Sequence, residues 1–348
     1  MEHNSVEAAR AAISAALVEA AEIDLSWLEP CPSLTGWELA PDALRLLASL
    51  VSRLRPQHIL EFGSGLSTRV MARACVYLGG TRWITSVDHD PVFAHAAAEQ
   101  FKGQETCCRI SFQLAPLIAR DCTGRSLPMY YIQADQIASS LPADLIVIDG
   151  PPAALGGREG VLYQALDFAR PGTVLVLDDA AREMELLALS RWQDNLGEAV
   201  EVNLLPGFAK GMAAAVVKEA VRRVDLEAHR MRLAIREIRG LISHGEKIIL
   251  VDQNQWRADD EFVCQSIPFV ERDGQYWGPP LDDTDAIREF ERMRQLAARF
   301  IVFGWPAFWW LDHYSKFARY LRERFQCVLE NDRLIAFDVR SYREEGRA

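Results

Sequence analysis

The chain has 348 residues, which is enough for two domains of ordinary size. Its composition, with 49% hydrophobic and 25% charged residues, is typical of a soluble protein that buries a sizeable core. The formal net charge of −11 argues against a broad nucleic-acid-binding face, which needs clustered lysine and arginine, so we expect no nucleic-acid partner.

The cysteines and the chain's most apolar segments indicate a cytoplasmic protein. Seven cysteines are an odd number, and none of them has the Cys-x-x-Cys spacing, so neither a disulfide framework nor a zinc ribbon is indicated. The amino terminus lacks the basic start and apolar core of a signal peptide. Phe300 to Leu311 is very apolar, but it contains Gly304 and Pro306 and is too short to span a bilayer.

The first predicted elements are helical. Val6 to Ala21 is rich in alanine and has an apolar face, and a proline-containing arm follows it, so residues 1–38 form an N-terminal helix and arm. The arm is open to two interpretations, a lid over a site or a packing segment. Pro41 then begins a helix that leads toward the next strand.

The stretch from His58 to Thr68 carries the first chemical signal. An apolar run ending in Phe62 predicts a buried parallel strand, and Gly63 and Gly65 allow a tight turn and a close approach of the backbone to a ligand. Ser67 or Thr68 can then open a helix. Within this stretch Glu61 places a carboxylate at the carboxyl end of the strand, where open parallel sheets bind ligands.

Three further strands end in carboxylates. Trp83 to Val87 precedes Asp88 and His89, Ala143 to Ile148 precedes Asp149, and Thr173 to Leu177 precedes Asp178 and Asp179. The carboxyl ends of parallel strands meet at one edge of a sheet, so these acids are expected to lie together. A sheet that is only structural has no reason to accept such mutual repulsion, which indicates a binding or catalytic site.

These residues resemble the class I S-adenosylmethionine-dependent methyltransferases over about Leu39 to Val217. The resemblance implies an α/β fold, a Rossmann-like domain over residues 39–217 with an open, mostly parallel sheet that an antiparallel strand pair closes. It also implies that the glycine loop passes under the methionine part of the cofactor, that its acid lies near the cofactor's amino group, and that the acid after the second strand holds the ribose. By position, the implied cofactor-binding residues are Glu61, Gly63, Ser64, Gly65, Ser67, Thr68, Asp88, His89, Ala115, Pro116 and Asp149.

The residues themselves support this resemblance over a nicotinamide dehydrogenase. A cationic sulfonium suits a carboxylate-rich pocket, whereas a dinucleotide pyrophosphate does not. Thr68 also stands where a dinucleotide-binding fingerprint has its third glycine. Between the strand ending at Leu114 and the strand before Asp149, the stretch Asp121 to Gln133 is atypical and is interpreted as an insertion, whose Tyr130-Tyr131 pair faces the substrate or simply packs.

Two mechanisms stay open on the acceptor side. Asp149, Asp178 and Asp179 resemble the ligands of the divalent-metal-dependent catechol-type O-methyltransferases, which would imply Mg²⁺. Asp179 replaces the usual asparagine, however, and Pro152 stands where those enzymes carry a lysine base. Without a metal, Asp149 would accept the acceptor's proton. The predicted substrate-binding residues are Arg158, Asp178 and Asp179. Arg158 either binds an anionic substrate group or pairs with a carboxylate.

The remainder of the chain predicts a second, smaller α/β domain. Residues 218–243 are interpreted as a charged linker helix, through which a homodimer is one alternative, and residues 244–348 alternate strands with helices. Five of the nine tryptophans lie in this second part, and its aromatic runs around Trp277 and Trp309 resemble a companion domain of bacterial surface-glycan enzymes. These aromatic side chains either stack on sugars or form a core or a seam.

We therefore predict an S-adenosylmethionine-dependent methyltransferase that O-methylates a small-molecule or sugar-containing acceptor in surface-glycan metabolism. Three alternatives remain. One is an N-methyltransferase, because Asp149-Gly150-Pro151-Pro152 loosely resembles the motif of amino-group methyltransferases. The others are an aminopropyltransferase-like enzyme of the same fold and a non-catalytic scaffold of a glycan pathway.

Overall fold

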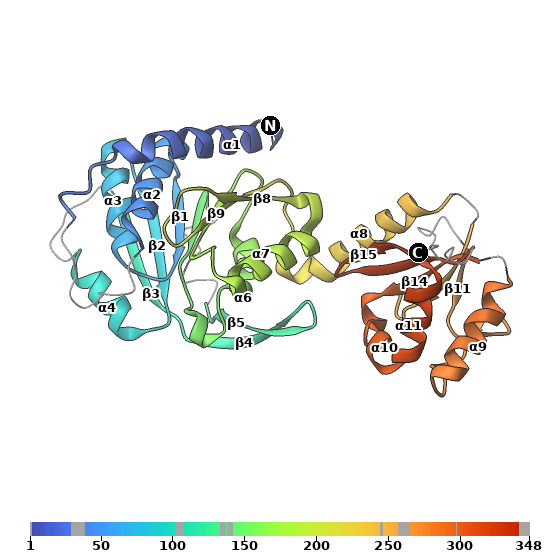
Figure 1. Cartoon of the computed structure of the whole chain (residues 1–348). Coiled ribbons are helices and arrows are strands. Elements are labelled where there is room, and N and C mark those ends of the chain that lie inside the picture. The colour runs from blue at the N-terminus through green and yellow to red at the C-terminus, as the bar shows by residue number, and fades with distance from the viewer. Residues whose placement is uncertain are drawn as a thin grey trace. The chain divides into compact units, whose positions relative to one another are not determined.

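The computed structural model describes residues 2–28, 39–101, 108–132, 137, 142–243, 246–256, 265–296 and 298–340. It divides into two compact units, Met1–Leu226 and Glu227–Ala348 (Figure 1). The predicted arm falls largely in residues 29–38, outside the described residues. Two helices at the start of the chain, α1 (Glu2–Glu19) and α2 (Pro41–Leu54), pack against each other.

A seven-stranded sheet forms the centre of the first unit. The strand order is β3-β2-β1-β6-β7-β9-β8, and every neighbouring pair is parallel except those that involve β9. The predicted open, mostly parallel sheet with an antiparallel closing pair is therefore confirmed. Its strands are β1 (His58–Phe62), β2 (Arg82–Asp88), β3 (Cys108–Leu114), β6 (Leu145–Ile148), β7 (Val174–Asp178), β8 (Val200–Leu205) and β9 (Met212–Val217).

Helices bury both faces of this sheet, which explains the continuous apolar runs of its strands. Because side chains alternate along a strand, Ile59 packs on the face covered by α1, α2 and α3, whereas Leu60 and Phe62 pack on the face covered by α6 and α7. The helices after α2 in this unit are α3 (Leu66–Leu78), α4 (Pro91–Glu99), α6 (Glu159–Ala165) and α7 (Glu183–Leu196).

The stretch interpreted as an irregular insertion is partly regular. β4 (Leu117–Cys122) and β5 (Arg125–Tyr130) form an antiparallel hairpin whose turn contains Thr123 and Gly124, both with positive φ. Gly124 and Pro128 obscured this hairpin in the sequence, because both residue types usually mark turns and loops. Pro128 is tolerated because the hairpin is a separate two-stranded sheet with free edges.

The second unit contains a five-stranded sheet in the order β11-β10-β14-β16-β15, so a further, smaller α/β region is confirmed. Its helix α8 (Leu226–Leu241) begins eight residues later than predicted and buries Ala234 and Ile238 against this sheet. The other elements are β10 (Lys247–Val251), β11 (Gln265–Pro268), β14 (Ala298–Gly304), β15 (Gln326–Glu330) and β16 (Leu334–Asp338), with α9 (Asp283–Arg294), α10 (Trp309–His313) and α11 (Ser315–Arg324).

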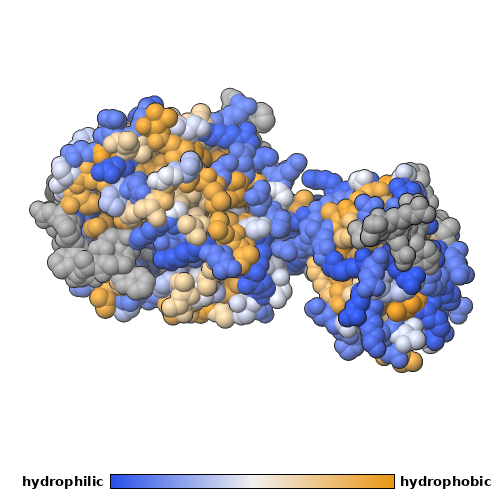
Figure 2. Space-filling view, in the orientation of Figure 1, coloured by the Kyte–Doolittle hydropathy of each residue, from blue (hydrophilic) through white to orange (hydrophobic). Residues whose placement is uncertain are grey.

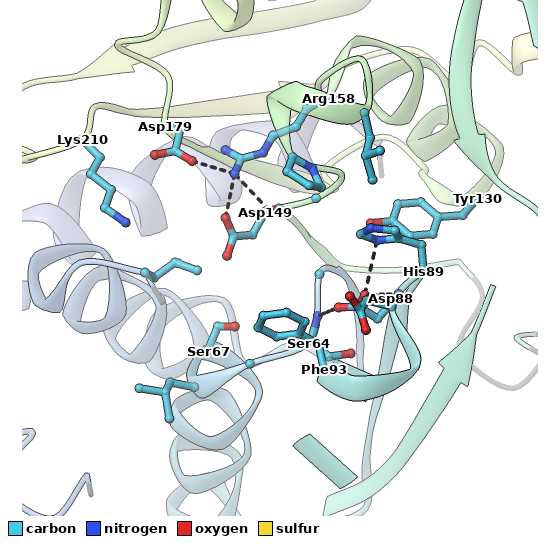
Figure 3. Close-up of a pocket in the computed structure, with 18 of the residues that line it drawn as sticks. Ser64, Ser67, Asp88, His89, Phe93, Tyr130, Asp149, Arg158, Asp179 and Lys210 are labelled. Atoms are coloured by element: carbon cyan, nitrogen blue, oxygen red, sulfur yellow. Dashed lines mark hydrogen bonds and ion pairs between the residues drawn. The ribbon is translucent and has the colours of Figure 1, made fainter. Parts of the chain in front are cut away.

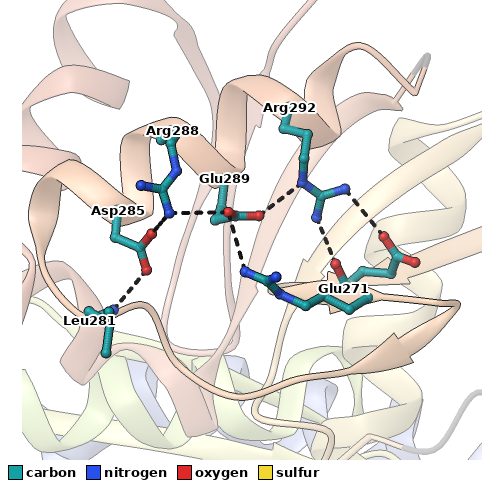
Figure 4. A network of polar contacts seen from close by, with 7 residues as sticks. Glu271, Leu281, Asp285, Arg288, Glu289 and Arg292 are labelled. Carbon is teal, nitrogen blue, oxygen red and sulfur yellow. Dashed lines mark hydrogen bonds and ion pairs between the residues drawn. The ribbon is translucent and has the colours of Figure 1, made fainter.

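A polar network stabilises one side of this unit (Figure 4). Glu289 on α9 is buried and accepts a hydrogen bond of 2.9 Å from Arg292 Nε, while Arg288 and Arg272 lie 3.4 and 3.6 Å away. Arg292 also donates to the Glu271 carbonyl oxygen at 2.6 Å, which joins α9 to the small hairpin β12 (Glu271–Arg272) and β13 (Gln275–Tyr276). These charges thus serve local structure.

The aromatic side chains of the second unit divide between core and surface. Trp256 and Trp310 are buried, whereas Trp277 is 71% exposed and Trp309 is 41% exposed. The face of this unit seen in Figure 2 is mostly hydrophilic, with small apolar areas.

Among the described residues, every helix is too short or too polar to cross a membrane. The described cysteines Cys75, Cys108, Cys122 and Cys327 form no disulfide bond with one another.

A truncation tests where the first unit ends. Val221 and Leu226 are buried in its core, and Arg223 donates to Asp167 through its backbone N–H at 3.0 Å and its Nε at 3.1 Å. We expect a fragment of residues 1–226 to unfold cooperatively in urea. A fragment of residues 1–217 should be less stable by about 3 kcal/mol or more, since it loses two buried aliphatic side chains. Equal stabilities would contradict this boundary.

Candidate functional site

A cavity of about 400 Å³ lies at the carboxyl edge of the first sheet (Figure 3). It is bordered by the segments that follow β1, β2, β6 and β7, as expected for an open parallel sheet. The predicted residues that line it are Gly63, Ser64, Gly65, Ser67, Asp88, His89, Asp149, Arg158 and Asp179. Five other predicted residues are not among its described lining: Glu61, Thr68, Ala115, Pro116 and Asp178.

The two glycines of the first loop have different roles. Gly63 has φ +101°, and a Cβ there would lie only 3.0 Å from the Asp149 carbonyl carbon and 3.1 Å from Gly150 N. The loops after β1 and β6 therefore pack backbone against backbone. A Cβ at Gly65 would meet no protein atom closer than Ser67 Oγ, at 4.0 Å. Gly65 thus leaves space beside the cavity, and Gly63 makes the turn possible.

Glu61 holds this loop in place through hydrogen bonds to the hydroxyl groups of Ser67 and Thr68. It is fully buried and accepts hydrogen bonds from the hydroxyls of Ser67, Thr68 and Ser86. Burial raises the pKa of its carboxyl group to about 7, although the three hydroxyl donors act in the opposite direction. The resemblance implied that this acid lies near the cofactor's amino group, but the structure places it outside the cavity lining. Through Ser67, which does line the cavity, Glu61 can position rather than contact a ligand.

Asp88 faces the cavity with both of its carboxylate oxygens anchored. Oδ2 accepts a hydrogen bond from the backbone N–H of Ser64 at 2.7 Å, and Oδ1 accepts one from Asp90 N–H at 2.8 Å. His89 Nδ1 lies 3.4 Å from Oδ1, and burial raises the pKa of Asp88. A carboxylate has about four acceptor positions, so this anchored group keeps capacity to bind a pair of ligand hydroxyls.

At the other end of the cavity, three aspartates lie around one arginine, and Figure 3 shows two of them, Asp149 and Asp179, with Arg158. Asp149, Asp178 and Asp179 have carboxylate oxygens within 4.8 Å of one another. Arg158 is 3% exposed, and its Nη2 donates to Asp149 Oδ1 at 2.8 Å and to Asp179 Oδ2 at 2.7 Å. Of the two roles left open for Arg158, the structure therefore shows the pairing with carboxylates. Arg182 adds a second ion pair to Asp179 at 3.0 Å.

This arrangement does not fit a divalent metal. The three carboxylates have suitable spacing, but the Arg158 guanidinium lies among them and occupies the oxygens that would face an ion. Pro152, which also lines the cavity, carries no amine that could act as a base. The donor set therefore does not support Mg²⁺ among these described residues, and no catalytic step is derived through a metal.

The electrostatic environment suits Asp149 to proton transfer. Burial raises its pKa well above the ordinary value, and the negative charges of Asp178 and Asp179 act in the same direction, while Arg158 opposes them. Burial likewise raises the pKa of Asp178. A carboxylate with a raised pKa that faces a cavity is a stronger proton acceptor than an ordinary aspartate.

Several lining residues were given no definite site role from the sequence, and for the Tyr130-Tyr131 pair two interpretations were left open. Tyr130 is 2% exposed and lines the cavity, whereas its neighbour Tyr131 is 45% exposed, so only the first of this pair faces the site. The Tyr130 ring lies 5.4 Å from Phe62 and 6.2 Å from His89. Phe93 from α4 and Lys210 from the β8–β9 turn were missed because neither adjoins a recognisable motif. The other unassigned lining residues are Leu39, Leu66, Asp90, Gly150, Pro152, Leu155 and Arg182.

Part of the first unit is similar to a known protein family. Residues 60–180 match the family model of a methyltransferase domain. This segment is therefore similar to a methyltransferase domain. The matched segment contains the glycine loop, Asp88, Asp149 and the Arg158 cluster, so the cavity just described belongs to this domain. A search of curated proteins found no match to the chain.

The solved structures that resemble this chain share low sequence identity with it. Cofactor-bound Rv0187 from MTB is 19% identical, with a TM-score of 0.38, and the match covers 61% of this chain and 90% of that one. An O-methyltransferase from Bacillus cereus in complex with SAH is 19% identical, with a TM-score of 0.39 and coverages of 58% and 90%. SAH-bound methyltransferase PaMTH1 from Podospora anserina is 17% identical, with a TM-score of 0.38 and coverages of 59% and 88%.

The raised pKa of Glu61 predicts a pH-dependent stability. The folded state holds the proton of the Glu61 carboxyl group up to a pH of about 7, whereas an unfolded glutamate releases its proton near the ordinary pKa of 4.5. Unfolding therefore becomes easier as pH rises through this window. The difference corresponds to about 3 kcal/mol above pH 7. When the free energy of unfolding is measured in urea at pH 5 to 8, it should decline less steeply with pH in Glu61→Gln than in wild type. Glu183→Gln, at an exposed position, controls for the change in charge. Parallel profiles of wild type and Glu61→Gln would refute the assignment.

Proposed function

We propose that this protein is an S-adenosylmethionine-dependent methyltransferase that transfers a methyl group to an oxygen of a small-molecule or sugar-containing acceptor. The observation that carries the proposal is the single cavity with an anchored carboxylate, Asp88, at one end and the carboxylate of Asp149 at the other. The first would hold the cofactor, and the second would receive the proton of the acceptor.

The cofactor half of the proposal rests on charge and space. The cofactor carries a sulfonium and an ammonium group, and a cavity with buried carboxylates favours such cations. Asp88 has the acceptor capacity for the two ribose hydroxyls, and Gly65 leaves room for the methionine part. Ser67, held by Glu61, would be a polar contact for that part. Phe93 and His89 supply flat side chains beside the ribose site.

The acceptor half rests on Asp149. When bound, S-adenosylmethionine supplies an electrophilic methyl group on a positively charged sulfur. Arg158 holds Asp149 Oδ1, and Figure 3 shows the other carboxylate oxygen turned toward the cavity. From there Asp149 would accept the proton of the acceptor hydroxyl. The oxygen of that hydroxyl would attack the methyl carbon, and the bond between that carbon and the cofactor's sulfur would break. Lys210 and Arg182, at the same end, would favour an acceptor with a negative group.

The second unit supports the sugar-containing class of acceptor in one respect. Trp277 and Trp309 present indole rings at its surface, and exposed aromatic rings can stack on sugars. A role in surface-glycan metabolism, a homodimer and a cytoplasmic location stay predictions. A screen of sugars, nucleotide sugars and phenols as methyl acceptors would identify the acceptor class.

A pair of glycine variants tests the cofactor assignment. Gly65→Val should leave the melting temperature near that of wild type, because a Cβ there lies no closer than 4.0 Å to Ser67 Oγ. The same change should abolish S-adenosylmethionine binding by filling the cavity. Gly63→Val should instead lower the melting temperature, because its Cβ collides with the loop after β6. Equilibrium dialysis with labelled cofactor measures the binding. If Gly65→Val is stable and binds normally, the cofactor does not occupy this space.

Asp149→Asn tests the proton acceptor. The amide keeps the shape of the side chain but cannot take the proton, so turnover should fall by about 10²–10⁴-fold while cofactor binding persists. Asp121→Asn, at an exposed position on β4, is the matched control and should retain full activity. An Asp149→Asn variant that turns over like wild type would exclude Asp149 as the base. Transfer to an amine, or of an aminopropyl group, in the same assay would favour the alternative enzymes.

A further inference from the structure

The carboxylate cluster at the acceptor end of the cavity contains its own cation. Asp149, Asp178 and Asp179 lie close enough to share an ion, and two of the three are almost fully buried. Burial without a compensating positive charge would keep such groups from ionising together. The buried positive charge within the cluster is the Arg158 guanidinium, which contacts all three residues, while the exposed Arg182 pairs with Asp179 alone among them.

Both Nη atoms of Arg158 contact the cluster. Nη2 donates to the side chains of Asp149 and Asp179 and lies 3.0 Å from the Asp149 carbonyl oxygen, and Nη1 donates to the carbonyl oxygen of Asp178. A guanidinium stays charged at all physiological pH values and presents its donors in a fixed plane. It can therefore bridge two strand ends, those of β6 and β7, as a metal ion would.

The backbone around Arg158 fixes this side chain in place. Gly156 and Gly157 precede it with φ of +102° and +73°, and its carbonyl oxygen accepts hydrogen bonds from Val161 and Leu162 at the start of α6. Glu185 on α7 is fully buried nearby and adds a further negative charge that favours the guanidinium. The arginine is thus part of the core and not a mobile surface group that a metal ion would displace easily.

We infer that Arg158 takes the place of a divalent metal in this methyltransferase site, so that the enzyme needs no metal, and that it acts as a positioning residue for Asp149. By holding Oδ1 of Asp149 it leaves the other carboxylate oxygen for the acceptor. The activity part of this inference rests on the proposed function, whereas the part that concerns metal binding can be tested without any turnover.

Mn²⁺ binding, followed by electron paramagnetic resonance on the full-length protein after dialysis against chelator, tests the first part. Wild type should bind no Mn²⁺ at the cluster. Arg158→Ala removes the guanidinium and leaves three carboxylates around the freed space, so it should gain a Mn²⁺ site. Adding Asp179→Asn to that variant should remove the gained site. Arg182→Ala, which removes the exposed arginine beside Asp179, should gain none.

The outcomes decide the inference in either direction. A Mn²⁺ site in wild type that Asp149→Asn removes, or a folded Arg158→Ala variant that gains no site, would overturn it. If Arg158→Ala does not fold, Mn²⁺ binding by wild type still decides whether the cluster holds a metal ion. Arg158→Lys gives a second variant, which keeps the positive charge. Arg158→Lys should lower kcat at least tenfold with little change in KM and should shift the pH dependence of kcat, since Asp149 loses its fixed orientation. An unchanged pH profile would contradict the positioning role.

Activity of wild type in chelator separates this inference from the proposed function. Full methyl transfer in chelator supports both. Methyl transfer that chelator abolishes and Mg²⁺ restores would overturn the inference and leave the proposed function intact. If no acceptor is methylated under any condition, the proposed function fails, and the Mn²⁺ measurements alone decide whether Arg158 stands where a metal would bind.

Discussion

The ion pairs of Arg158 allow several carboxylates to share the buried edge of the first sheet. Asp149 and Asp179 end neighbouring strands and accept hydrogen bonds from the same guanidinium nitrogen. Without that group, the acids would repel one another in a poorly hydrated environment. The orientation of Asp149, the start of α6 and the shape of the cavity's acceptor end all depend on this arginine, because its backbone leads directly into the helix.

The acidic residues at the strand ends share a sequence pattern but have different physical roles. Glu61 is enclosed by hydroxyls and supports the loop above it. Asp88 is held by backbone N–H groups and faces the cavity. Asp149 is held by a cation and has a raised pKa. Position at the carboxyl edge brings such residues together, but the donors around each carboxylate determine whether it supports the fold, binds a ligand or accepts a proton.

Much of the fold was predictable because it follows from local patterns. Apolar runs bounded by glycine or proline located the strands of the first sheet to within about two residues, and the resemblance supplied the sheet's open, mostly parallel arrangement. The β4–β5 hairpin was missed because Gly124 and Pro128 indicate turns. The start of α8 was misplaced because charged residues before Leu226 continue a helical pattern, although Val221 belongs to the first unit's core.

The site was predictable only in part, because its geometry depends on residues distant in sequence. Strand-end acids and the glycine loop have sequence signals, and most of them do line the cavity. No sequence pattern distinguishes whether Arg158 reaches a substrate or Asp179, since that depends on how β7 ends beside the loop after β6. Lys210 and Phe93 reach the cavity from a turn and a helix that carry no motif.

The most direct test of the central claim is a calorimetric titration of the intact protein with S-adenosylhomocysteine, the demethylated product, which binds without reacting. We expect saturable binding of one molecule per chain and no heat with NAD⁺, because the cavity offers carboxylates where a pyrophosphate would need hydrogen-bond donors. No heat with S-adenosylhomocysteine, or saturable binding of NAD⁺ in its place, would contradict it.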